Sequence, residues 1–115
     1  MESARPNPKE GTPPPPALDV LDGPDVGKRF LIEKSLVTIG RGEDRDIRFH
    51  DRAMSRKHCE ILFVEGRLII RDTASQNGIK VNGRQTMEQE LVDGDQIDIG
   101  SSRFIIHIPP YPKTK

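Results

Sequence analysis

Three short polar segments hold the side chains of this sequence that are best suited to chemistry. They are Gly-Arg at positions 40–41, Ser-Arg-Lys-His at 55–58 and Ser-Gln-Asn-Gly at 75–78, and each comes after an apolar, strand-like run. A guanidinium fork and a hydroxyl with a basic neighbour are donors that match phosphate oxygens, and a side-chain amide can pair with a peptide backbone. Taken together, the segments predict a site for a phosphate monoester carried on an extended peptide.

Each segment also has a simpler interpretation when it is taken alone. Gly40 can form a tight corner after which Arg41 is a solvated charge, and Asn77-Gly78 can be an ordinary turn. Ser55 and His58 have the spacing of a nucleophile beside a base. A hydrolase also needs a third orienting group and an oxyanion cradle, and no Gly-x-Ser-x-Gly element is present. We therefore expect no catalytic residue and no enzyme.

Composition excludes several other classes of function. The formal net charge of the 115 residues is zero, which argues against nucleic-acid binding. No apolar stretch approaches the ~20 residues that cross a bilayer, and no signal-peptide core follows Met1. The three histidines and the single Cys59 show no metal-ligand spacing, and no glycine-rich phosphate loop precedes a helix. We expect no metal and no cofactor, and the lone cysteine favours a cytoplasmic location.

The elements that must position these segments are strands. Short alternating or apolar runs are separated by turn signals every 6 to 12 residues, among them Glu65-Gly66 and Asn82-Gly83. This rhythm predicts an all-β sandwich of about nine to eleven short strands. Residues 85–91 are expected to be a loop with a brief strand. The expected strands cover residues 18–21, 29–32, 36–39, 47–49, 59–64, 67–71, 79–81, 96–99 and 103–108.

The chain divides into one folded unit and two tails. Residues 1–17 are rich in proline and poor in apolar side chains, so we expect a disordered N-terminal tail. Residues 18–108 are the predicted domain, and residues 109–115 are a C-terminal tail or linker. A unit of this size can bury a core but has no room for two lobes around a deep cleft.

The order of the three polar segments resembles the forkhead-associated (FHA) domain, a module that binds phosphothreonine. Two further stretches carry the resemblance. Residues 91–100 are similar to the family's Leu-x-x-Gly-Asp-x-Ile-x-Ile-Gly pattern, and residues 46–49 with Asp51 fall where the family has its Asp-Ile-x-Leu strand and turn. The resemblance covers residues 18–108. It implies an eleven-stranded sandwich whose loops at one end hold phosphothreonine in an extended peptide.

The resemblance also assigns roles to individual residues. It implies that Arg41 and Ser55 are the principal phosphate ligands and that Arg56 adds a further phosphate contact. Gln76 and Asn77 fall at the positions that bind the peptide backbone. Gln76 departs from the Thr or Ser that is common there. The positions that the family keeps for loop architecture are occupied by Gly40, His58 and Gly78.

The expected function is therefore non-catalytic recognition of phosphothreonine peptides in signalling by Ser/Thr kinases. An alternative is a phosphate-independent protein interaction domain of the same fold, and either could be the regulatory part of a longer signalling protein. The expected partner is a phosphothreonine-containing protein or peptide. Thr12, which precedes Pro13 in the tail, is a candidate phosphosite that a second molecule of this chain could bind.

Overall fold

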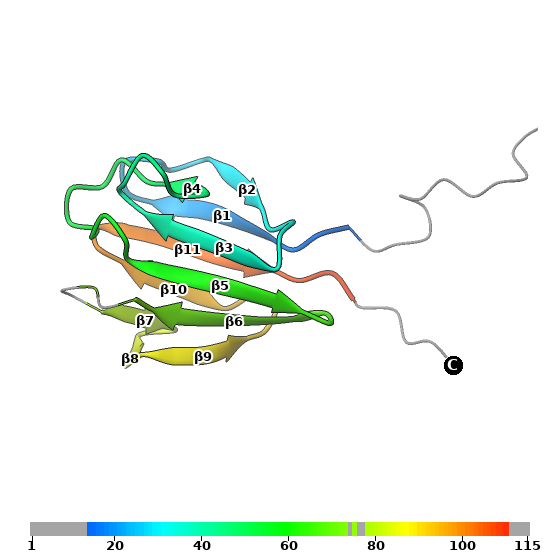
Figure 1. The fold of residues 1–115 in the computed structure, drawn as a ribbon. Helices are drawn as coiled ribbons and strands as arrows, with labels where there is room; N and C mark the ends of the chain where they lie inside the picture. Colours follow the sequence, from blue (N-terminus) through cyan, green and yellow to red (C-terminus); the bar gives the residue numbers. More distant parts are fainter. Residues whose placement is uncertain (1–13, 74, 76–77, 111–115) are drawn as a thin grey trace, which may run out of the picture.

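The computed structural model describes residues 14–73, 75 and 78–110, which form a sandwich of two β-sheets (Figure 1). Eleven strands account for the regular structure of these residues. This confirms the predicted all-β sandwich. The number of strands is at the upper end of the expected range of nine to eleven. Gln76, Asn77 and Thr12 lie outside the described residues.

One sheet has six strands in the order β2-β1-β11-β10-β7-β8. The register of its paired strands is antiparallel throughout. The strands are β1 (Ala17–Asp22), β2 (Arg29–Leu31), β7 (Ile79–Val81), β8 (Arg84–Thr86), β10 (Gln96–Ile99) and β11 (Ser102–His107).

The other sheet has five strands in the order β4-β3-β5-β6-β9. β3 pairs in parallel with β4 and antiparallel with β5, so the chain must cross over between β3 and β4. The crossover is residues 41–46 and begins with Arg41 of the first polar segment. The strands are β3 (Leu36–Gly40), β4 (Ile47–Arg48), β5 (Cys59–Val64), β6 (Arg67–Asp72) and β9 (Glu88–Leu91).

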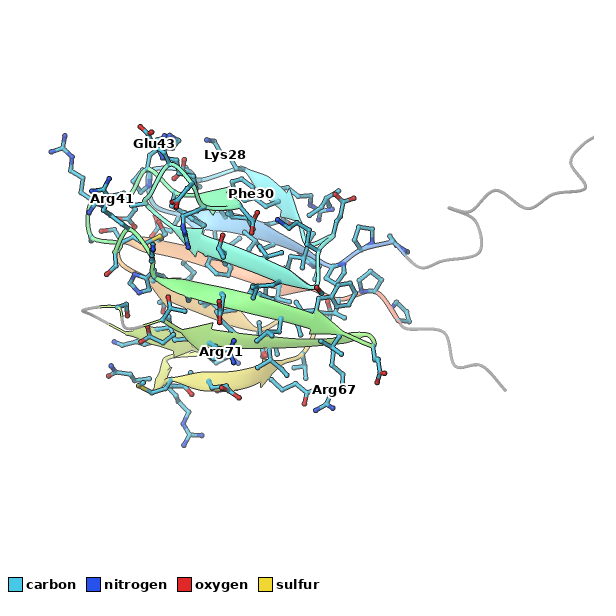
Figure 2. The ribbon with its side chains drawn as sticks, in the orientation of Figure 1. Lys28, Phe30, Arg41, Glu43, Arg67 and Arg71 are labelled. Carbon is cyan, nitrogen blue, oxygen red and sulfur yellow. The ribbon has the colours of Figure 1, made fainter. Side chains whose placement is uncertain are left out.

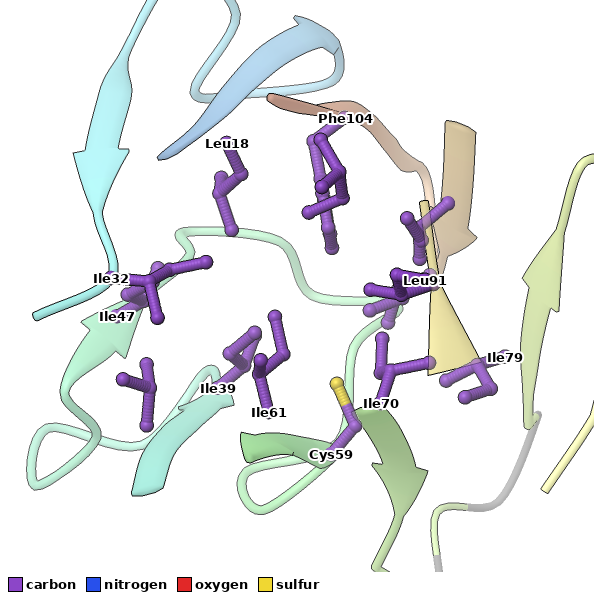
Figure 3. Packing of buried hydrophobic residues seen from close by; sticks show 14 of the residues in the cluster. Leu18, Ile32, Ile39, Ile47, Cys59, Ile61, Ile70, Ile79, Leu91 and Phe104 are labelled. Atoms are coloured by element: carbon purple, nitrogen blue, oxygen red, sulfur yellow. The ribbon is translucent and has the colours of Figure 1, made fainter. Parts of the chain in front are cut away.

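The core lies between the two sheets because alternate side chains of each strand point inward. Phe104 from one sheet packs on Phe49, which in turn packs on Phe30, with ring centroids 5.8 and 5.9 Å apart. Figure 3 shows side chains from both sheets filling this space. Fully buried members of the core include Leu18, Ile32, Ile39, Ile61, Leu68, Ile70, Ile79, Ile97, Ile99 and Ile106.

The nine expected strands are present with ends that differ by at most one residue, and two differences from the sequence prediction affect the layout of the chain. β1 begins at Ala17, one residue before the expected domain start, because the Pro16 carbonyl accepts a hydrogen bond from the Ile32 amide at 2.8 Å. Residues 85–91 contribute to two strands rather than one. Asn82 and Gly83 have φ angles of 52° and 85°, and this turn folds β8 back on β7. The chain then passes to the other sheet at the exposed Met87 and forms β9.

This topology gathers the connections that carry the polar segments. In Figure 1 the β3–β4 and β4–β5 loops lie at one end of the sandwich, and the described chain enters β1 and leaves β11 at the opposite end. The β6–β7 connection also lies at the loop end, since β6 is antiparallel to β5 and its last residue, Asp72, pairs with Cys59.

Candidate functional site

The β3–β4 and β4–β5 loops are held together by their backbones. The Arg41 amide donates to the Ser55 carbonyl at 3.0 Å, and the Gly42 amide donates to the Arg56 carbonyl at 3.1 Å. Gly40 makes this approach possible. A Cβ at Gly40 would overlap the Arg56 carbonyl oxygen and lie only 2.8 Å from its carbon. Only glycine therefore fits at position 40, and the two loops act as one unit.

Arg41 is exposed at this end of the sandwich (Figure 2), but its stem is fixed. The Nε of Arg41 donates to the Met54 carbonyl at 3.0 Å, and the Arg41 carbonyl accepts from Arg48 Nε at 3.2 Å. Neither Nη atom of Arg41 has a hydrogen-bond partner among the described residues. Because Nε is already bonded, the two Nη groups are the donors that a ligand can use.

His58 connects the β4–β5 loop to the β6–β7 loop. Its ring is fully buried, with Nδ1 accepting from the Ser55 amide at 2.9 Å and Nε2 lying 2.8 Å from the Gly78 carbonyl. Because an amide can only donate and a carbonyl can only accept, the ring carries its proton on Nε2. The Ser55 amide is therefore used within the protein.

Hydrogen bonds also hold the described residues that flank Gln76 and Asn77. The Ser75 amide donates to the Asp72 carboxylate at 2.9 Å, and the Gly78 amide donates to the Ser75 hydroxyl at 2.8 Å. Gly78 has a φ of 76°, a conformation that glycine adopts without strain. Ser75 is thus tied to the end of β6, and the two residues that flank the predicted amides, Ser75 and Gly78, are bonded to each other.

A buried carboxylate anchors the β4–β5 loop from the side of the β10–β11 turn. Asp51 is 1% exposed and accepts hydrogen bonds from the Ala53 amide at 2.9 Å, the Ser101 amide at 2.8 Å and the Ser102 hydroxyl at 2.7 Å. These bonds position the turn that ends at the Met54 carbonyl. The sequence prediction placed Asp51 in a turn of the FHA pattern but gave it no part in the site.

A second buried carboxylate, Asp25 of the β1–β2 loop, was missed altogether. It accepts from the His50 amide at 2.7 Å, and it contacts His50 Nδ1 at 2.8 Å and Lys28 Nζ at 3.1 Å. Burial opposes its ionisation, yet these partners hold the pKa of Asp25 below its ordinary value. An isolated Asp in a Gly- and Pro-containing loop gives no sequence signal for such a role.

Asp46 fixes the far side of the β3–β4 loop. Its carboxylate accepts from Lys34 Nζ at 2.6 Å and from the Thr38 amide at 2.9 Å and hydroxyl at 3.0 Å. The hydrogen bond from Lys34 and those from Thr38 lower the pKa of Asp46 to about 2. The loop that presents Arg41 is thus held at both ends, by Asp46 and by the bonds to the β4–β5 loop.

The end of the sandwich built from these loops offers donors and positive charge. Arg56 and Lys57 are exposed and line a shallow depression with Gly42, Glu43 and Asp44. Within the described ranges no three His, Cys, Asp or Glu side chains gather as metal ligands, and no helix is long and apolar enough to cross a membrane. The arrangement suits the binding of an anion on a peptide.

Comparisons with known proteins agree with this geometry. The FHA domain family model matches residues 37–100. The glycogen accumulation regulator GarA of Mycobacterium tuberculosis is 35% identical over 102 residues, which are 88% of this chain and 63% of GarA. The oxoglutarate dehydrogenase inhibitor of Corynebacterium glutamicum is 37% identical over 93 residues, 81% of this chain and 65% of that protein. The chain thus spans less than two thirds of either relative.

Solved structures give the same result. One FHA domain from a study of phosphothreonine-dependent FHA domain interactions superposes with a TM-score of 0.77 at 34% identity, covering 83% of this chain and 97% of that domain. The FhaA FHA domain, in complex with the intracellular domain of Rv3910, superposes with a TM-score of 0.75 at 34% identity, covering 80% of this chain and 99% of that domain. On the evidence of sequence and fold alike, this chain belongs to the FHA domain family.

Proposed function

We propose that this protein binds phosphothreonine in an extended peptide and thereby acts as a non-catalytic receptor in Ser/Thr kinase signalling. The observation that carries the proposal is the joining of the Arg41 and Ser55 loops by backbone bonds of 3.0 and 3.1 Å, while the Arg41 side chain bonds to described residues through Nε alone. The two joined loops carry two cationic side chains and one hydroxyl that can donate to a phosphate. Arg41, Ser55 and Arg56 are the proposed phosphate ligands, and Gln76 and Asn77 the proposed peptide ligands.

Discrimination against the unmodified peptide follows from charge. A phosphate dianion at this site would accept three or four charge-assisted hydrogen bonds, each contributing ~1.5–3 kcal/mol before ordering costs. A threonine hydroxyl lacks the charge and most of the acceptors. The relatives with phosphothreonine-dependent interactions or a bound partner domain support this assignment.

The same geometry argues against a hydrolase built on Ser55 and His58. Nδ1 of His58 accepts the Ser55 amide and Nε2 faces the Gly78 carbonyl, so neither ring nitrogen is left to take a proton from the Ser55 hydroxyl. The related proteins named as a regulator and as an inhibitor also fit a binding role. We therefore assign His58, with Gly40 and Gly78, to loop architecture.

The proposal is tested by calorimetry with a phosphothreonine peptide and its unphosphorylated form. Arg41→Ala should weaken phosphopeptide binding by about 2–4 kcal/mol, because a bidentate charged contact is lost, and Arg41→Lys should restore only part of it. Arg67→Ala is the matched control, since Arg67 is also an exposed arginine but lies at the opposite end of the sandwich (Figure 2).

Two results would refute the proposal in different ways. Near-native affinity of a folded Arg41→Ala protein would refute the assigned site. Equal binding of the phosphorylated and unphosphorylated peptides would favour the alternative, a phosphate-independent interaction domain of the same fold.

We further propose that the folded domain is the part that binds the phosphopeptide, that residues 1–16 serve as a tail, and that the protein works in the cytoplasm. Phosphorylated Thr12 is a possible ligand for a second molecule. β1 starts at the end of the sandwich opposite the loops, and the five residues from Thr12 to Ala17 span at most ~18 Å. This length is too short for Thr12 to reach the loops of its own molecule at the far end of the sandwich. Light scattering of the protein phosphorylated at Thr12 tests this, and a species that stays monomeric would exclude it.

A further inference from the structure

Several cationic side chains in the part of the chain that the structure describes form ion pairs with neighbouring carboxylates. The pairs sit on the outer faces of both sheets and in the turns between strands. They join Asp19 to Arg29, Asp25 to Lys28, Asp46 to Lys34, Glu60 to Arg71, Glu90 to Arg67, and Asp98 to Arg103.

At the loop end Arg45 is paired with Asp44, but several other cations have no such pair. In the described part of the chain no ion pair involves Arg41, Arg52, Arg56 or Lys80, and all four are exposed. The first three lie on the β3–β4 and β4–β5 loops, and Lys80 lies on β7, two residues after Gly78. Exposed cations that form no ion pair within the protein favour a ligand that supplies negative charge.

Two depressions at the loop end differ in the charges that ion pairs leave uncompensated. The first, between the β3–β4 and β4–β5 loops, contains Glu43 and Asp44 as well as Arg56 and Lys57. Asp44 is bonded to Arg45 at 3.1 Å, and this arginine lowers the pKa of Asp44. Glu43 forms no ion pair with a described residue, so an unpaired carboxylate remains beside Arg56 and Lys57, and this depression gives little preference for either charge.

The second depression lies on the other side of the Ser55 loop and contains Lys80. Ala53, Gly78, Lys80, Asp98 and Gly100 line it. Asp98 is opposite Lys80 in the register of β10 and β7, but its carboxylate is held by Arg103 Nε at 2.7 Å. The ammonium of Lys80 therefore remains uncompensated. Arg52, which is exposed, directly precedes Ala53 in the chain.

We propose that the partner is an acidic phosphopeptide, with Asp or Glu on one side of its phosphothreonine bound over the depression that contains Lys80. This inference rests on the proposed phosphothreonine binding and adds the chemical class of the peptide. The residues that determine it are Lys80 and, to a smaller extent, Arg52. The other side of the phosphothreonine lies toward Glu43 and Asp44, where a carboxylate gains nothing.

The test compares four peptides by calorimetry on the full chain. The first is a phosphothreonine peptide with neutral flanks, the second and third carry two Glu residues on the N-terminal or the C-terminal side only, and the fourth is an unphosphorylated acidic peptide. One of the two acidic phosphopeptides, and not both, should bind about two- to fivefold more tightly than the neutral one, as expected for exposed ion pairs. The gain should shrink with added salt.

The gain should disappear in Lys80→Ala and fall in Arg52→Ala. Arg84→Ala is the matched control, because Arg84 is an exposed cation on the neighbouring strand β8 that forms no ion pair with a described residue and does not line this depression. Binding of the neutral phosphopeptide should be nearly unchanged in all three variants.

An acidic flank that gives no gain, or a gain on both sides that survives Lys80→Ala, overturns this inference while phosphothreonine binding stands. Absence of binding to every phosphopeptide, or equal binding of the acidic peptide without phosphate, overturns the proposed function and this inference with it.

Discussion

Replacing Gly40 with alanine tests whether the contact between the two loops creates the site. The added Cβ would lie 2.8 Å from the Arg56 carbonyl carbon and 3.0 Å from the Ser55 carbonyl oxygen, where ordinary contact begins at 3.4 Å. The obstructing atoms are backbone, so the β4–β5 loop must move by about 1 Å rather than rotate a side chain. Gly40 has no positive φ, so the effect comes from the overlap alone.

The movement breaks the two backbone bonds between the loops, Arg41 to Ser55 at 3.0 Å and Gly42 to Arg56 at 3.1 Å. Their loss should lower the free energy of unfolding by about 1–3 kcal/mol. The phosphate ligands would also separate, and we expect at least a tenfold loss of phosphopeptide affinity, since a displacement of this size spoils bidentate geometry.

The assay is denaturant unfolding and calorimetry on the same protein, with Gly94→Ala as the control. Gly94 has a φ of 93° and no atom within 4 Å of its Cβ position, so alanine there is strained but does not overlap any neighbour. It lies in the β9–β10 turn, away from the loops. Gly94→Ala should therefore lose stability and keep binding. If Gly40→Ala is destabilised but binds phosphopeptide as tightly as the Gly94 control, the loop contact does not create the site.

Three further predictions follow from the same contacts. His58→Ala should lower the free energy of unfolding by about 2–4 kcal/mol, because a buried ring is removed and the Ser55 amide and Gly78 carbonyl lose their partner; an unchanged thermal midpoint would contradict this. The carboxylate of Asp46, whose folded-state pKa is about 2, contributes stability that is present above its ordinary pKa of 3.8 and is lost as pH falls through 2. The pair with Lys34 is exposed, so the contribution is about 1 kcal/mol or less, and unfolding curves of Asp46→Asn should show a smaller fall from pH 4 to pH 2 than the unaltered protein. Phosphopeptide affinity should decrease from pH 7 to pH 5, since the second pKa of the phosphate is near 6, and a flat affinity in calorimetry across this range would argue against a phosphate ligand.

Much of the fold follows from local sequence. The apolar runs in residues 59–64 and 67–71 predict two strands, and Glu65-Gly66 fixes their hairpin, because both residues adopt positive φ, at 53° and 80°. Residues 85–91 were harder to predict. Their pattern gives no apolar face for β8, and the two strands there exist because the Asn82-Gly83 turn and the edge of the second sheet offer backbone partners.

The sequence by itself determined the chemistry of the candidate site, since the types and order of Arg41, Ser55 and His58 are local information. Only the tertiary structure decided how these groups are used. Whether the Ser55 amide faces a ligand or His58, and whether Asp51 is an exposed turn residue or a buried anchor, depends on segments that are distant in the chain. The unpaired state of Lys80 is likewise tertiary, because it arises from the bond between Asp98 and Arg103. Hydrogen bonds and ion pairs are decided by which groups meet in space, and local sequence fixes only the groups that are available.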